Sequence, residues 1–186
     1  MKRRSKGLGF GGFLSEFRLY LCNEWVAAIP SHAFRNFFYR KVMGFQIGPG
    51  AAILMHCRFG CARNFRLGAH SVINQCCRLD NRGGLFIGSN VSVSPDVAIW
   101  TADHDLNTSN FAGRCKAVHI GDFAWIGTRA TILPGANLGL GCVVAAAALV
   151  SRPVAPYVVV SGIPAKQKSL RNKDINYELS YRRRFQ

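Results

Sequence analysis

Apolar residues recur at every sixth position through the middle of this 186-residue chain. A spacing of six fits neither an α-helix, whose faces repeat every 3.6 residues, nor a long strand, whose faces repeat every two. It indicates short strands that turn after each sixth residue, so that three of them close one coil of about 18 residues. The lead positions of these repeats are Ile47, Ile53, Phe59, Leu67, Ile73, Leu79, Ile87, Val93, Ile99, Ile120, Ile126, Ile132, Leu138, Val144 and Val150.

The pattern predicts an all-β solenoid of about five coils, in which each lead residue points inward and stacks on the lead residue of the next coil. The residue four positions later is mostly small or β-branched, as at Cys57, Cys77 and Cys142, and we expect it to fill the inside of a corner. Glycine often follows the lead residue, where we expect it to adopt the unusual dihedrals of the turn. Such a solenoid is stable when its open ends are covered.

The repeat is interrupted once, between His104 and Ile120. The loop 105–119 must therefore leave the solenoid at a corner, where an insertion costs the core little and can build the wall of a site. Imidazole is suited to taking a proton from a hydroxyl near neutral pH, so a histidine at the base of this loop is a candidate general base. The local sequence leaves equally open a loop histidine that only bonds the backbone.

The two flanks are predicted to be appendages of a β-helix domain that spans 47–164. The first flank, 1–46, holds eight basic and two acidic residues, and 13–45 reads as two helices separated at Pro30, with Ser31 as the N-cap of the second. These helices fit a cap on the open end of the solenoid, a peripheral contact with an anionic membrane surface, or both. The second flank, 165–186, reads as a basic helix or tail.

Composition limits the classes of partner. Lys and Arg number 24 against nine Asp and Glu, but the excess lies mainly in the flanks, and the repeats lack the stripe of aromatic and basic residues that stacks bases. No nucleic-acid partner is therefore expected. The seven cysteines include no C-x-x-C pair, and we recognise neither a secretory leader nor 18 consecutive apolar residues. We expect free thiols, no metal site and a cytoplasmic location.

Three segments carry a resemblance to a known family: TADHD before the loop, VHIGDFAWIGTRATILPGANLGLG after it, and VVVSGIPAK near the end. They resemble the hexapeptide-repeat acyltransferases of the sugar O-acetyltransferase branch, which includes maltose, galactoside and nodulation acetyltransferases. LDNRGGLFIG and IPSHAFR are similar to members from surface-polysaccharide clusters. The resemblance covers about 47–168 and implies a left-handed parallel β-helix, a homotrimer, and acetyl-CoA as co-substrate with no bound cofactor.

The resemblance also implies roles for particular residues. His104 matches the general base of the family, and Asn74 matches the asparagine that meets the acceptor. Asp105 is expected beside the base, either orienting it or lying on the surface. The run VVAAAALVSRPVAP departs from the family, which usually has Gly and Ser near 147–148 and Lys-Asp at 152–153. The residues expected to contact acetyl-CoA are Trp125, Thr128, Ala146, Ser151, Lys166 and Lys168, and those expected to contact the acceptor are Asn74, Asp80, Arg82 and Asp105.

Asn74 and His104 fall at different corners of the predicted coil, so we expect the site to lie between neighbouring subunits. The resulting interpretation is an acyl-CoA-dependent O-acyltransferase that acetylates a sugar hydroxyl of a glycan or its precursor, in the cytoplasm or at the inner face of the membrane. Alternatives are an N-acyltransferase on an amino-sugar nucleotide, a metal-dependent hydratase like the γ-class carbonic anhydrases, and a non-catalytic scaffold. The hydratase needs three histidines across an interface, and the spacing of His104 and His119 does not match its pattern.

Overall fold

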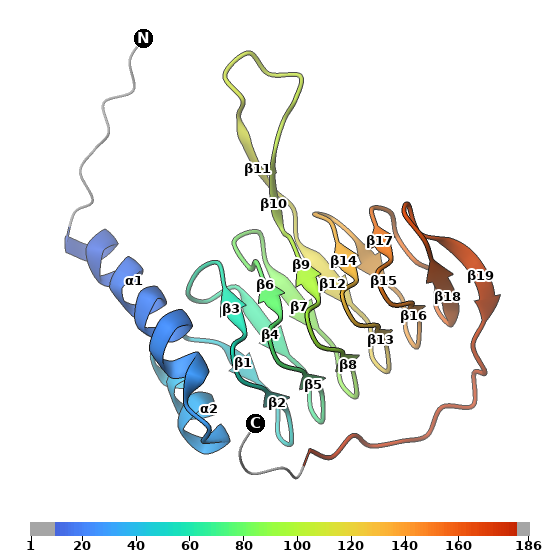
Figure 1. Ribbon diagram of the computed structural model, residues 1–186, viewed down its shortest axis with the longest axis horizontal. Coiled ribbons are helices and arrows are strands. Elements are labelled where there is room, and N and C mark those ends of the chain that lie inside the picture. The colour runs from blue at the N-terminus through green and yellow to red at the C-terminus, as the bar shows by residue number, and fades with distance from the viewer. Residues whose placement is uncertain (1–9, 182–186) are drawn as a thin grey trace.

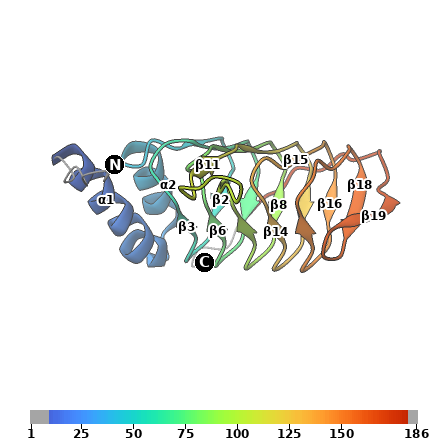
Figure 2. The same ribbon diagram turned by 90° about the horizontal axis from the view of Figure 1, so that it is seen from above.

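The protein, seen in a computed structural model that describes residues 10–181, is a solenoid of about six turns with helices at its N-terminal end (Figure 1). Residues 1–9 of the expected N-terminal extension and 182–186 of the expected tail lie outside the described residues. The turns stack along one axis from the helices to the last strand (Figure 2). Because successive turns form three sheets of parallel strands, the predicted fold class is confirmed.

Each sheet collects one strand from each turn. The first sheet contains β1 (Gln46–Ile47), β4 (Phe65–Leu67), β7 (Leu85–Ile87), β12 (Val118–Ile120) and β15 (Asn137–Leu138). The second sheet contains β2 (Ala52–Ile53), β5 (Val72–Ile73), β8 (Ser92–Val93), β13 (Trp125–Ile126), β16 (Val143–Val144), β18 (Val158–Ser161) and β19 (Lys166–Leu170). The third sheet contains β3 (Arg58–Phe59), β6 (Arg78–Leu79), β9 (Ala98–Ile99), β14 (Thr131–Ile132) and β17 (Leu149–Val150).

The lead residues stack from turn to turn as the repeat predicts. In the second sheet Ile53 pairs with Ile73, and Ile73 pairs with Val93. All three side chains are fully buried, and burying each is worth about 1.5–3 kcal/mol. The core is therefore a column of lead residues that runs inside the three sheets.

Three of the seven cysteines belong to this core. Cys57, Cys77 and Cys142 are buried, as their position in the repeat predicts. Burial raises the pKa of the Cys142 thiol to about 12, so this group stays protonated and packs as a small apolar side chain. All seven cysteines are free thiols.

The glycines after the lead residues are required for a different reason than the sequence suggests. Gly68 and Gly88 do not adopt a positive φ, so the expectation of unusual dihedrals is wrong for them. A Cβ on Gly68 would lie 2.4 Å from the carbonyl carbon of Gly88, and one on Gly88 would lie 2.8 Å from the backbone nitrogen of Asp122. Successive turns approach too closely here for any side chain. Positive φ angles occur two residues later, at His70 and Asn90.

The solenoid has about six turns rather than the expected five because its last step is shorter. The lead residues Ile120 and Leu138 are paired and lie 18 residues apart (138 − 120), whereas Leu138 pairs with Val154 only 16 residues on (154 − 138). The same step of 16 joins Val144 to its partner Val160 (160 − 144). A strict period of six therefore ends one turn too early.

Helices cover the N-terminal end of the solenoid. α1 (Phe10–Tyr20) continues through short π-helical and 3-10 turns, Leu21–Trp25 and Val26–Ala28, and α2 (His32–Lys41) follows. The Ser31 side chain accepts a 3.4 Å hydrogen bond from the Phe34 N–H, which confirms the predicted N-cap. Within residues 10–181, no helix is long and apolar enough to cross a bilayer.

α2 caps the first turn through an aromatic and a charged side chain. The buried Tyr39 ring lies edge-on to Phe59, with 5.4 Å between centroids. Arg35 is fully buried and donates to the carbonyl oxygens of Ile53, at 3.1 Å, and Ile29. Because these groups close the open end of the first turn, the interpretation of α2 as a cap is confirmed.

The expected C-terminal helix is not formed over 171–181, and that prediction is wrong. β19 pairs antiparallel with β18 and covers the last turn. The chain then runs back along the solenoid toward the N-terminal helices (Figure 1), where Arg171 donates to the Phe123 carbonyl at 2.8 Å and the Tyr181 ring lies 5.2 Å from His32. The solenoid edge offers the tail hydrogen-bond acceptors that compete with a short exposed helix.

The three edges of the solenoid therefore differ. The tail lies along the edge between the first and second sheets, here called the tail edge. The edge between the second and third sheets carries Asn74, Thr128 and Ala146 and is called the Asn74 edge. The edge between the third and first sheets carries Arg82 and Ser151 and is called the hairpin edge. From it project β10 (Ala102–His104) and β11 (Gly113–Cys115) (Figure 1).

Candidate active site

The interruption of the repeat forms a β-hairpin that projects from the hairpin edge (Figure 1). β10 and β11 pair antiparallel, with His104 opposite Gly113. On β11, Arg114 donates to both carboxylate oxygens of Asp103 at 2.8 Å each. These hydrogen bonds hold the pKa of Asp103 below its ordinary value. The ion pair braces the hairpin and places His104 where its first strand ends.

The exposed His104 ring is oriented by a backbone carbonyl. Its Nδ1 lies 3.0 Å from the carbonyl oxygen of Phe111, and because a carbonyl can only accept, Nδ1 carries the donated proton. The Phe111 ring stacks on the imidazole with 4.1 Å between centroids and 6° between planes. In the neutral ring Nε2 then has a free lone pair, which is the form that can take a proton from a hydroxyl.

Asp105 serves the loop rather than the imidazole. Its carboxylate accepts the Asn107 N–H at 3.0 Å and lies 3.9 Å from Arg114. Its backbone carbonyl accepts the hydroxyl of Thr108. Within residues 10–181 no hydrogen bond joins Asp105 to His104, so the orienting contact is made by Phe111, which the sequence interpretation missed. Only its position across the loop from His104 could have indicated it.

Asp80 holds the base of the hairpin and is only 3% exposed. Its Oδ2 accepts the N–H groups of Thr101, at 3.1 Å, and Ala102, at 3.0 Å. Its carboxylate also accepts Nε and Nη2 of Arg82, at 2.8 and 3.1 Å. Burial alone would raise the pKa of Asp80, but the hydrogen bonds from Arg82 and Thr101 outweigh burial and keep it below its ordinary value. One ionised carboxylate therefore joins the second turn to the hairpin.

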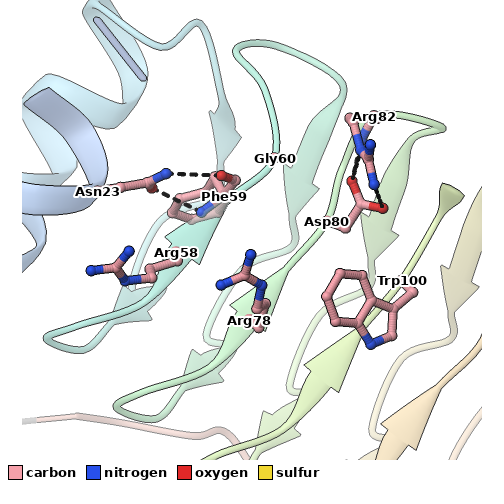
Figure 3. Close-up of a pocket in the computed structure, with 8 residues that line it drawn as sticks. All are labelled: Asn23, Arg58, Phe59, Gly60, Arg78, Asp80, Arg82 and Trp100. Atoms are coloured by element: carbon pink, nitrogen blue, oxygen red, sulfur yellow. Dashed lines mark hydrogen bonds and ion pairs between the residues drawn. The ribbon is translucent and has the colours of Figure 1, made fainter. Parts of the chain in front are cut away.

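A pocket of about 300 Å³ adjoins the base of the hairpin (Figure 3). Besides Asp80 and Arg82 it is lined by Arg58 on β3, Arg78 on β6 and Trp100 directly after β9. The sequence interpretation missed the last three, because the repeat constrains only inward positions. The available signal was that Arg58 and Arg78 occupy the same position in neighbouring turns, where the structure pairs them.

Three expected site residues follow the Asn74 edge in successive turns. The Asn74 side-chain amide donates to the Val93 carbonyl at 2.8 Å, so its orientation is set by the next turn. The Thr128 hydroxyl donates to the Pro95 carbonyl at 2.7 Å. Ala146 is exposed in the turn after Thr128. The edge presents small, exposed side chains beside Asn74.

The remaining expected donor contacts lie on both free edges. Trp125 is half exposed on β13, and its Nε1 donates to the Ser94 hydroxyl at 3.2 Å. Lys166 and Lys168 are exposed on β19, at the far end of the same sheet. Ser151 follows β17 and therefore lies on the hairpin edge. The structure thus sorts the expected residues into an Asn74 group and a hairpin group, and one chain does not bring Asn74 and His104 to the same edge.

A metal centre would need a cluster of ligands. Among residues 10–181, no three His, Cys, Asp or Glu side chains gather in a way that could hold an ion. His119, considered for a hydratase, instead stacks on Phe86 on the outer face of the first sheet, with 5.0 Å between ring centroids. Independence from metal stays a prediction.

Comparison with known proteins places this geometry in context. No family model matches the chain. Nodulation protein L of Rhizobium meliloti (strain 1021) is 38% identical over 136 residues, which cover 70% of this chain and 73% of that protein. Galactoside O-acetyltransferase of Escherichia coli (strain K12) is 24% identical over 161 residues, covering 84% of this chain and 79% of that one.

Solved structures agree with the sequence relatives. The hexapeptide-repeat acetyltransferase VCA0836 from Vibrio cholerae O1 biovar eltor, in complex with acetyl coenzyme A, superposes with a TM-score of 0.75 at 26% identity. The alignment covers 86% of this chain and 87% of that chain. The likeness therefore includes the solenoid and most of its flanks.

The pH dependence of stability tests the role of Asp80. Its lowered pKa means that the ionised carboxylate stabilises the fold above about pH 4, the ordinary aspartate range, and that this contribution is lost as the pH falls through the lowered pKa. Asp80→Asn should lower the free energy of unfolding by about 1–3 kcal/mol at pH 7. The difference from the parent should shrink as the pH is taken below about 4.

Chemical denaturation at one protein concentration, repeated from pH 7 to pH 3, measures this difference. Asp103→Asn is the matched control, because its ion pair with Arg114 is more exposed, and its effect should be much smaller. An Asp80→Asn effect that equals the control, or that does not change with pH, would remove the buried carboxylate from this role.

Proposed function

This chain belongs to the hexapeptide-repeat sugar O-acetyltransferase family, and we propose that it transfers an acetyl group from acetyl-CoA to a hydroxyl of a surface polysaccharide or its precursor. The observation that carries the proposal is the orientation of His104. Its Nδ1–H is held by the Phe111 carbonyl, so the neutral ring presents a free Nε2 lone pair on a projecting hairpin. That is the arrangement a general base for a sugar hydroxyl requires.

The transfer needs no covalent intermediate on the enzyme. Nε2 of His104 takes the proton as the sugar oxygen attacks the thioester carbonyl, and backbone N–H groups stabilise the resulting oxyanion. When the tetrahedral intermediate collapses, the C–S bond breaks and the thiolate takes the proton from the imidazolium. The products are the acetyl ester and free CoA, and the base returns to its neutral form.

The Asn74 edge supports a path for the donor. Thr128 and Ala146 are small and exposed in successive turns, which leaves room for the pantetheine arm to follow the backbone. Trp125 lies half exposed on the adjacent sheet face. Lys166 and Lys168 on β19 are placed to meet the phosphates of the nucleotide end. Asn74, further back on the same edge, is assigned to the acceptor.

The site is completed by a homotrimer in this proposal. Asn74 and His104 lie on different edges, so the hairpin edge of one chain must face the Asn74 edge of the next. The hairpin supports such a contact, because it projects from its own solenoid and exposes Leu106 (84%) and Phe111 (58%). Ser151, on the hairpin edge, would then lie near the donor bound by the neighbour.

The acetylated atom distinguishes the main alternative. An N-acyltransferase on an amino-sugar nucleotide could use the same base, but its product is an amide that survives mild hydroxylamine, whereas an ester is cleaved. The scaffold alternative predicts no acetyl transfer at all. We favour the ester because the relatives named above include a galactoside O-acetyltransferase.

We place the reaction in the cytoplasm, at the membrane face. The free thiols fit a reducing compartment. α1 exposes Phe13, Leu14 and Phe17, and Arg18 lies on the same short helix. Exposed apolar side chains beside basic ones favour a peripheral contact with anionic lipid.

Removing the base tests the mechanism. His104→Ala should fold and assemble as the parent does but lose acetyl transfer by roughly 10²–10⁴-fold, because proton transfer from the hydroxyl is no longer catalysed. Release of free CoA thiol, followed with acetyl-CoA and a saccharide panel, measures the rate. His119→Ala is the control, since this histidine is exposed on the first sheet and has no assigned role. A His104→Ala rate within a few-fold of the parent would exclude the mechanism.

Mixed assemblies test the shared site. His104→Ala and Asn74→Ala should each be impaired as homotrimers. Mixed trimers should recover part of the activity, because some interfaces then pair an intact His104 with an intact Asn74. Recovery should peak at intermediate mixing ratios. If mass measurement verifies mixed trimers and they gain nothing, then the two residues do not meet across an interface.

Vesicle binding tests the membrane contact. The parent should co-sediment with vesicles containing phosphatidylglycerol and not with pure phosphatidylcholine, and high salt should weaken the binding. The double variant Phe13→Ser/Phe17→Ser should bind much less, because the apolar face of α1 is lost. Leu170→Ser removes a similarly exposed side chain from β19 at the other end of the solenoid and should change nothing. Equal binding by all three proteins would contradict the proposal.

A further inference from the structure

The pocket at the hairpin base has a chemical character that the fold does not require (Figure 3). Arg58, Arg78 and Trp100 form a row across the outer face of the third sheet, with the Arg82–Asp80 pair at the strand ends (Figure 3). Outward positions of these short strands are free to carry any polar residue. The pocket instead places three guanidinium groups around about 300 Å³.

The acceptor groups in this pocket are already used. Asp80 receives the side chain and backbone N–H of Arg82 as well as the N–H groups of Thr101 and Ala102. The Asn23 side chain is also closed, because it accepts the Phe59 N–H at 2.9 Å and donates to its carbonyl at 3.0 Å. Neither side chain has capacity left for the hydroxyl groups of a neutral sugar. We therefore treat Asp80 as a positioning residue for Arg82 and the hairpin.

The donor groups, in contrast, keep unused capacity. Arg58 binds Glu24 in a bidentate pair at 2.8 Å, but both side chains are well exposed and its Nε–H makes no hydrogen bond in the described chain. Arg82 likewise binds Asp80 only through Nε and Nη2. Arg78 has no carboxylate partner within residues 10–181, and its guanidinium carbon lies 5.5 Å from the centroid of the Trp100 ring.

Charge and geometry together define the ligand. A pocket with one uncompensated guanidinium, two further arginine donors and no free acceptor favours an anion. Trp100 adds an apolar ring face on which the apolar face of a sugar can pack. The pocket shares Asp80 with the hairpin that carries His104, so a ligand bound here lies on the hairpin edge, away from Lys166 and Lys168.

The geometry points to an acidic acceptor: the saccharide that this enzyme acetylates bears a phosphate or carboxylate, which binds to Arg78 with help from Arg58 and Arg82. This inference rests on the proposed function, since it assigns the pocket to the acceptor of that reaction. The anionic group fixes the sugar at the hairpin base, so that a hydroxyl can be presented to His104. The donor phosphates are bound elsewhere, at the end of the second sheet.

Binding and transfer are measured with three related probes: glucose, glucuronate and glucose 1-phosphate. Titration calorimetry or ligand-observed NMR on the full chain gives the Kd, and release of CoA thiol gives kcat and KM. The parent should bind at least one of the two charged sugars more tightly than glucose. Arg78→Gln should raise Kd and KM for that sugar roughly 10- to 100-fold, while kcat and the KM for glucose change little.

Arg66→Gln is the matched control, because Arg66 is exposed on β4 of the first sheet and its loss changes the net charge equally. It should leave all constants unchanged. Free CoA should not displace the charged sugar from the parent. Displacement by CoA, equal effects of the two arginine variants, or equal affinity for charged and neutral sugars would overturn the inference. If the charged sugar binds through Arg78 but no acetyl transfer to any saccharide occurs, the pocket assignment stands and the proposed function fails.

Discussion

Stacking of each inward lead residue on the next turn is the interaction on which the whole molecule depends. Strands of two or three residues, such as β5 and β7, have no stability of their own. They persist because Ile73 and its counterparts bury apolar surface between turns, and because parallel backbone pairs form in the same register. The ends need covers for the same reason, and α2 with Arg35 and Tyr39 supplies one of them.

This construction separates stability from chemistry. The column of lead residues is indifferent to what leaves the solenoid at an edge, so an insertion between β9 and β12 can become a hairpin without disturbing the core. Its placement is determined by a few polar contacts instead. Asp80 anchors the hairpin base, the Arg114–Asp103 pair braces its strands, and the Phe111 carbonyl sets the tautomer of His104. The free edges then carry the residues of the proposed site, while the tail occupies the third.

Sequence was a sufficient guide wherever a residue's role is set by the repeat. The lead residues, the buried Cys57 and the position of His104 at a break all follow from a period of six, because inward positions tolerate few side chains. Prediction failed where the determining contact is remote in sequence. The sixth turn depends on a step of 16 residues, the tail depends on carbonyls such as that of Phe123, and the arginine pocket lies on outward positions that the repeat leaves unconstrained. The assigned roles of Asn74 and the donor residues come from resemblance and remain proposals.

A crystal structure of the assembled protein with CoA is the measurement that tests the central claim most directly. The account predicts three chains around one axis, with the CoA sulfur within roughly 3–4 Å of Nε2 of one chain's His104 and the pantetheine arm against Thr128 and Ala146 of its neighbour. It also predicts that Nδ1 of that imidazole still meets the Phe111 carbonyl. CoA bound with its sulfur remote from every His104, or enclosed by the edges of a single chain, would contradict the account.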